Sequence, residues 1–174
     1  RALSIQMAAA NEFYAHGARL SEWQKDRISE VDGNNGDPAE DYTLQTDASG
    51  EGRATGILRT RAVLRSMYEN TQTQFEEAGV THLRLFRGSD AAPREAFNDG
   101  RVSIDSNALE SWSADYHVAE GFGGTVITAV VPVKDILCTV NTGFGCLRER
   151  EVVVIGNGLR YGVVYSGEMD QYDD

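Results

Sequence analysis

The sequence predicts an α+β domain in which helices come first and a set of short strands follows. Residues 1–30 and 57–78 are rich in helix-forming residues, and both segments lie in the first half of the chain. Beyond residue 79 the chain changes to short runs of β-branched residues that are separated by glycines and polar turns. Few helix patterns interrupt these runs, and this order of segments is typical of an α+β fold.

Length and charge limit the classes of function. The 174 residues are enough for one domain with a hydrophobic core, so we treat residues 1–174 as a single domain. The formal net charge of -11 at pH 7 argues against nucleic acid as a partner, because phosphate backbones select for Lys and Arg. No apolar run approaches the roughly 18 residues of a membrane span, so we predict no membrane partner. The chain starts at Arg1 without a signal peptide, and we expect a piece of a longer protein or a processed product.

Neither the cysteines nor the Asp-rich stretches predict a disulfide or metal site. Cys138 and Cys146 are close enough in sequence to pair, but two cysteines do not make a disulfide scaffold, and we expect free thiols. Residues 32–38 and 47–52 consist largely of turn-forming residues. A calcium loop would need a ligand where Gly36 falls, so we predict no metal.

The first half of the chain divides into a helical part, a loop and a long helix. Residues 1–30 lack proline and are expected to form one or two helices, with a break near Gly17. Residues 31–56 form the predicted loop. A core at 57–167 then opens on the best helix pattern, and Gly79 stands where this helix would take a C-terminal cap.

Strand patterns fill the rest of this core. We predict strands at 80–88, 109–113, 125–133, within 133–140, and at 147–155 and 159–165. A polar loop is expected at 89–106, and a brief helix through Ala119 would take Ser113 as its N-cap. Asn157-Gly158 indicates a hairpin turn, and the acidic tail at 168–174 is expected to fray.

Two carboxylates stand at the start of one predicted strand. In a strand, side chains at i and i+2 point to the same face, so Glu149 and Glu151 would project together. Arg148 and Arg150 would take the opposite face. Taken alone, this alternation also fits a solvated strand start.

Three stretches occur in order along the chain: Leu85-Phe86-Arg87-Gly88, Ser111-Trp112-Ser113 and Glu149-Arg150-Glu151. Their order and spacing resemble the mono-ADP-ribosyltransferases of the Arg–Ser–Glu class. These enzymes have an Arg on the first core strand, a Ser-x-Ser motif on the second and a Glu-x-Glu pair near the end. The resemblance covers roughly residues 57–158 and is greatest to actinobacterial and phage-associated members, some of them toxin domains. It implies an ADP-ribosyltransferase fold, with N-terminal helices followed by two packed, mostly antiparallel β-sheets and an NAD cleft between them.

The resemblance also implies roles for individual residues. NAD would be the co-substrate, without a metal, and the positive charge that builds on the ribose as nicotinamide leaves would be stabilised by Glu151. Ser111 would orient Glu151 by a hydrogen bond. Arg87 would bind the NAD diphosphate or the adjacent ribose through its planar fork of donors. Gly88 would let the backbone approach the nicotinamide.

Two aromatic residues and the first glutamate extend the implied site. Phe122, eleven residues after Ser111, would stack on nicotinamide, or else pack as a core residue behind the short helix. Phe144 would recognise the protein substrate, or pack within its loop. Glu149 goes with arginine acceptors in this family, because a carboxylate can orient a guanidinium and take its proton. The diphosphate-binding Arg of toxin members has no counterpart in residues 123–125.

The resulting expectation is a protein-arginine ADP-ribosyltransferase of the glycosyltransferase class, acting on a protein with an accessible arginine. A toxin of this type would also be expected to have an immunity protein as a partner. We expect a delivered or secreted effector, or a phage-particle component, that acts in the cytoplasm of a target cell. Two alternatives stand beside this: an NAD glycohydrolase toxin with water as acceptor, and a non-catalytic structural module of a phage head protein.

Overall fold

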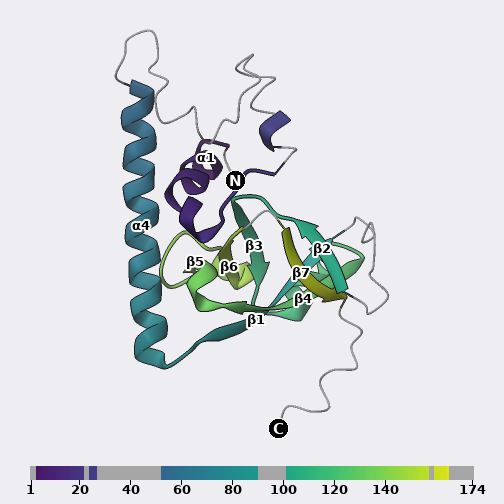
Figure 1. Cartoon of the computed structure of the whole chain (residues 1–174). Coiled ribbons are helices and arrows are strands. Elements are labelled where there is room, and N and C mark those ends of the chain that lie inside the picture. The colour runs from purple at the N-terminus through teal and green to yellow at the C-terminus, as the bar shows by residue number, and fades with distance from the viewer. Residues whose placement is uncertain (1–2, 22–23, 27–51, 90–100, 157–158, 165–174) are drawn as a thin grey trace.

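The computed structural model confirms the α+β class, with helices at the start of the chain and strands after them (Figure 1). It describes residues 3–21, 24–26, 52–89, 101–156 and 159–164. Most of the predicted loop, the Asp-rich stretches, the Asn-Gly turn and the acidic tail lie outside the described residues.

The helices are α1 (Leu3–Glu12), α4 (Gly52–Ala78), α5 (Tyr116–Glu120) and the 3-10 turns η1 (Tyr14–His16), η2 (Val133–Asp135) and η3 (Leu147–Glu149). The long helix α4 begins at Gly52, before the predicted start at Ile57. The prediction missed this first part because its glycines made the segment resemble a loop. It ends as expected, with Gly79 in the left-handed conformation at φ 67. Among the described residues, no helix combines the length and apolar character needed to cross a membrane.

The strands are β1 (His82–Ser89), β2 (Arg101–Asp105), β3 (Leu109–Ser113), β4 (Thr125–Pro132), β5 (Ile136–Thr139), β6 (Glu151–Ile155) and β7 (Leu159–Val164). The strand β2 falls in a segment that was predicted to be a loop, and that prediction is wrong. Its five residues alternate between polar and apolar types too briefly to stand out, and its place depends on pairing with the distant β7.

The strands form one hydrogen-bonded sheet in the order β2-β7-β4-β1-β3-β6-β5, and all recorded pairings are antiparallel. The predicted division into two separate sheets is therefore not confirmed. The link between its halves is nevertheless thin: β1 pairs with β4 from His82↔Pro132 to Ser89↔Thr125, but with β3 through Phe86↔Ser113 alone.

The predicted hairpin between the last two strands is also wrong. The strand β6 pairs with β3 and β5, so both of its edges are occupied. The strand β7 pairs with β2 and β4 instead, in the other half of the sheet. An Asn-Gly sequence favours a tight turn, but it cannot say which edge the following strand will find.

Two hydrophobic clusters cover the two faces of β3, β5 and β6. One lies against α1 and α4, and its members include Phe13, Leu64, Leu109, Leu137, Val153 and Ile155. The other joins these strands to β1 and β4, and its members include Leu85, Trp112, Ile127, Val131, Ile136, Val152 and Val154. Successive valines of β6 thus enter different clusters, which explains why this strand is apolar at every position after Glu151. Figure 1 shows α4 along one flank of the molecule, beside β5.

A buried glutamine attaches α1 to the edge of β3. Gln6 is 4% exposed, and its Nε2 donates to the backbone carbonyl of Leu109 at 2.9 Å. The backbone N–H of Leu109 donates back to Gln6 Oε1 at 2.7 Å. The side-chain amide therefore satisfies both polar groups of one buried peptide position, as a neighbouring strand would do.

Replacing this residue tests the attachment. We expect Gln6→Ala to lower the free energy of unfolding by about 2 kcal/mol, because it leaves two buried backbone groups without their partner. Urea denaturation measures the change, and Gln74→Ala on the exposed face of α4 is the control. A loss in Gln6→Ala no larger than in the control would show that the paired hydrogen bonds contribute nothing to stability.

Candidate active site

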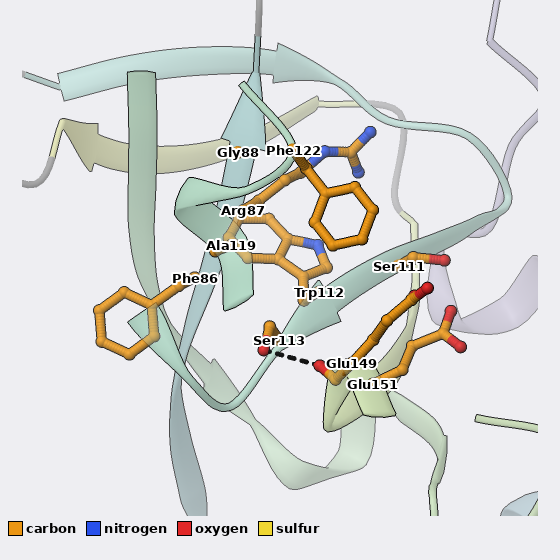
Figure 2. Close-up of a pocket in the computed structure, with 10 residues that line it drawn as sticks. All are labelled: Phe86, Arg87, Gly88, Ser111, Trp112, Ser113, Ala119, Phe122, Glu149 and Glu151. Carbon is orange, nitrogen blue, oxygen red and sulfur yellow. Dashed lines mark hydrogen bonds between the residues drawn. The ribbon is translucent and has the colours of Figure 1, made fainter. Parts of the chain in front are cut away.

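A pocket opens where β1, β3 and α5 meet the turn before β6 (Figure 2). Its volume is about 280 Å³, and its walls are formed by Phe86, Arg87, Gly88, Ser111, Trp112, Ser113, Ala119, Phe122, Glu149 and Glu151. The three remote stretches that the sequence singled out therefore meet at one hollow. Their catalytic and binding roles stay predictions.

Of the residues predicted for the site, Phe144 is the one that does not line this pocket. It lies in the loop before η3 and is 37% exposed. Phe122, by contrast, is 56% exposed and lies on the pocket wall. A flat ligand ring could therefore reach Phe122, whereas a role for Phe144 in recognising a protein partner stays a prediction.

Glu151 is the first residue of β6 and is 7% exposed. Its Oε2 accepts a hydrogen bond from the backbone N–H of Cys146 at 2.7 Å. Across the ladder it is paired with Ser113 of β3. A rigid strand and a backbone donor together fix the direction of this carboxylate at the pocket wall.

Glu149 is held differently, which corrects the prediction that both glutamates extend from one strand. It is the last residue of the 3-10 turn η3, and β6 begins only at Glu151. Between them Arg150 adopts the left-handed conformation, with φ 46 and ψ 42. This residue ends the turn before β6 begins, so the two carboxylates reach the same pocket from different elements (Figure 2).

The left-handed backbone of Arg150 is strained by roughly 1 kcal/mol for a residue with a β-carbon. Contacts to the turn after β3 hold it in place. The carbonyl of Arg150 accepts from the backbone N–H of Ala114 at 3.1 Å. Its guanidinium Nη1 lies 3.1 Å from Asp115 Oδ2.

Ser113 makes a second connection between the same two turns. Its hydroxyl donates to the backbone carbonyl of Glu149 at 2.8 Å and accepts from the backbone N–H of Asp115 at 3.0 Å. Ser113 is therefore not the N-cap of the short helix, as predicted. The N-cap is Asp115, whose Oδ1 accepts from the backbone N–H of His117 at 2.9 Å. The hydroxyl of Ser113 instead anchors the turn that carries Glu149.

The other two residues of this motif lie as strand alternation predicts. Ser111 is exposed and lines the pocket, opposite Val153 in the register with β6. Trp112 is 3% exposed and packs in the cluster with Leu85, as expected for a core residue. Its ring also forms part of the pocket wall, which the sequence did not indicate (Figure 2).

Arg87 is paired with the carboxylate of Glu110, which belongs to none of the three sequence motifs. Its Nη1 forms an ion pair with Oε2 of Glu110, whose side chain is 3% exposed. Burial lowers the pKa of the Arg87 guanidinium from its ordinary value, but an arginine in a protein keeps its charge. A signal for Glu110 was available: it is two residues before the buried Trp112, so strand alternation places both on the same face.

Gly88 has a structural reason to be glycine. A β-carbon at this position would lie 2.1 Å from the backbone carbonyl oxygen of Ala119. One at Gly123 would lie 2.3 Å from the backbone of Ser89. The end of β1 and the loop after α5 thus meet backbone to backbone, and this contact places Phe122 over the pocket.

The arrangement brings opposite charges to one hollow. The carboxylates of Glu149 and Glu151 can stabilise a positive charge that develops on a ligand, and the guanidinium of Arg87 can bind a phosphate. Both cysteines are free thiols, as predicted. In the described part of the chain, no group of three or more His, Cys, Asp or Glu side chains could hold a metal ion.

Comparison with known proteins identifies the family. The family model described as dinitrogenase reductase ADP-ribosyltransferase matches residues 20–163, a range that contains every residue of the pocket wall. No curated protein and no solved structure matches the chain. The chain therefore belongs to the dinitrogenase reductase ADP-ribosyltransferase family, and is an enzyme that transfers ADP-ribose from NAD to a protein.

Proposed function

We propose that this enzyme attaches a single ADP-ribose to an arginine side chain, with a catalytic site of the Arg–Ser–Glu class. The observation that carries the proposal is the meeting of Arg87, Ser111, Glu149 and Glu151 at one pocket. The family is named after an ADP-ribosyltransferase of dinitrogenase reductase. For this chain we propose a protein with an accessible arginine, without naming it.

The reaction breaks the bond between the nicotinamide nitrogen and C1′ of the ribose. As that bond lengthens, positive charge builds on the sugar, and the fixed carboxylate of Glu151 stabilises it. Arg87 binds the diphosphate or the adjacent ribose, and Phe122 stacks on the leaving nicotinamide. A pocket of about 280 Å³ suits the nicotinamide–ribose end of NAD and leaves the adenosine end outside.

Glu149 acts on the acceptor. A guanidinium is a poor nucleophile while it is protonated, so a nearby carboxylate must orient it and take a proton as the new nitrogen–C1′ bond forms. Glu149 is only partly buried, on a surface turn at the pocket. A side chain from a second protein can therefore approach it from outside. Phe144, exposed in the preceding loop, is a further point of contact for that protein.

The setting in which the enzyme works is also a proposal. The resemblance to phage-associated and toxin members favours a delivered effector or a particle-bound domain that acts in the cytoplasm of a target cell. An immunity protein would follow from a toxin role. Hydrolysis of NAD by water is the alternative activity, since it needs Glu151 and the NAD-binding residues but not Glu149.

Removal of the charge at Glu151 tests the chemical step. We expect Glu151→Gln to lower both ADP-ribose transfer and NAD hydrolysis by about 10²-fold or more, because the developing cation loses its counter-charge. Labelled NAD with a basic acceptor protein reports both activities. Glu76→Gln, on the exposed face of α4, should leave them unchanged. Full transfer by Glu151→Gln would remove the basis for the assigned mechanism.

A second substitution separates transfer from hydrolysis. In Glu149→Gln we expect transfer to arginine to fall by about 10²-fold while hydrolysis stays within about threefold, because a protonated guanidinium must be oriented and lose a proton, whereas water can attack the cation-like ribose directly. The two products are separated and counted in the same reaction. If hydrolysis falls as steeply as transfer, Glu149 serves the NAD chemistry and the proposed arginine acceptor loses its support.

A substitution of Ser113 should also separate transfer from hydrolysis, with a smaller effect than the substitution of Glu149. We expect Ser113→Ala to lower the ratio of transfer to hydrolysis by about fivefold, since the turn of Glu149 loses a hydrogen bond of about 1 kcal/mol. Ser66→Ala, on the exposed face of α4, is the matched control. An unchanged ratio in Ser113→Ala would mean that this hydroxyl does not position Glu149.

A further inference from the structure

We infer that Glu110 is a positioning residue for NAD, which acts by holding the guanidinium of Arg87 at the pocket. The inference rests on the proposed role of Arg87 in binding NAD. Arg87 lines the pocket, whereas Glu110 does not. Glu110 therefore acts on a ligand through Arg87 and not by direct contact.

The ion pair lies beside the single residue pair that joins β1 to β3 in the sheet. The strands β1 and β3 share the pair Phe86↔Ser113, and toward the end of β1 the recorded pairing between them stops. Arg87 follows Phe86 directly, and Glu110 lies three residues before Ser113. Their side chains meet across the gap between the two strands, where no backbone ladder holds them together. The position of Arg87 thus depends on a side-chain contact.

Glu110 is a firm support for this contact. Its side chain is 3% exposed, and its Oε1 accepts from the backbone N–H of Asn107 at 2.5 Å, while Oε2 faces Arg87. The adjacent Leu109 is attached to α1 by the two hydrogen bonds of Gln6. Both oxygens of the carboxylate therefore have partners, and the strand that carries Glu110 is held by hydrogen bonds to α1.

Arg87 has donors to spare. A guanidinium carries five N–H donors in one plane, and a carboxylate on one edge leaves the others for a second anion. The side chain of Arg87 is 31% exposed, in contrast to its buried partner. Because Glu110 restricts the rotation of a long flexible side chain before the ligand arrives, binding loses less conformational entropy.

The substitution Glu110→Gln keeps the shape of the side chain and removes its charge. We expect it to raise the Kd and KM for NAD by about tenfold and to change kcat by less than about threefold, because Glu110 orients a binding group and not a reacting atom. Isothermal titration with NAD and steady-state transfer assays measure these quantities. Glu120→Gln, which changes an exposed side chain of helix α5, is the matched control.

A double-variant cycle separates positioning from a purely structural role. In the background of Arg87→Gln, the added change Glu110→Gln should leave the Kd within about twofold, since the group through which it acts is gone. Thermal unfolding checks that each variant is folded. If Glu110→Gln does not fold, Glu110→Asp, which keeps the charge but shortens the reach, should raise the Kd in the same direction.

The outcomes are distinct. An unchanged Kd in Glu110→Gln, or a lower one, overturns the inference, because the carboxylate would then be neutral toward NAD binding or compete with the diphosphate for Arg87. An equal rise in Kd with and without Arg87 also overturns it. A wild-type enzyme that neither binds NAD nor transfers ADP-ribose would contradict the proposed function itself.

Discussion

The separation of β1 from β3 is the constraint on which the site depends. These neighbouring strands share the pair Phe86↔Ser113, and the pocket lies where they diverge. An ordinary ladder at this point would fill the gap with paired backbone groups. Instead, Arg87 and Glu110 supply opposite charges across it, and the backbone contact of Gly88 with the loop after α5 closes one side. The hollow therefore results from incomplete strand pairing within a continuous sheet.

The residues proposed to act on NAD and the residue proposed to act on the acceptor are carried by different kinds of structural element. Arg87 extends from β1, which packs against the cluster of Leu85 and Trp112, and Glu151 extends from β6, which is packed on both faces. A charge carried by a packed strand is placed accurately. Glu149 is carried by a surface turn held by Ser113 and by the strained backbone of Arg150. A reaction with a small co-substrate and a large protein acceptor calls for this division, because the acceptor must reach the site from outside.

Much of the site could be predicted from the sequence, because its motifs are short and ordered along the chain. Strand alternation placed Ser111 and Trp112 correctly. Both predicted carboxylates line one pocket, but they reach it from a turn and a strand and not from one strand. The features that could not be predicted depend on contacts between distant parts of the chain or on the local backbone conformation. The partner of Arg87 lies on another strand, and nothing in the sequence announces that Arg150 is left-handed. The neighbours of β2 and β7 depend on which sheet edges are free, and this is decided by the whole fold.

The turn of Glu149 has a consequence for how such enzymes can diversify. It is held to the segment after β3 by the buried hydroxyl of Ser113, one backbone hydrogen bond and one exposed ion pair. Substitution of the exposed Leu147 or Arg148 leaves the buried valines of β6 in place, provided that Cys146 keeps its backbone hydrogen bond to the carboxylate of Glu151. New protein targets could thus be acquired by remodelling a few surface residues, while the machinery that cleaves the dinucleotide is inherited intact.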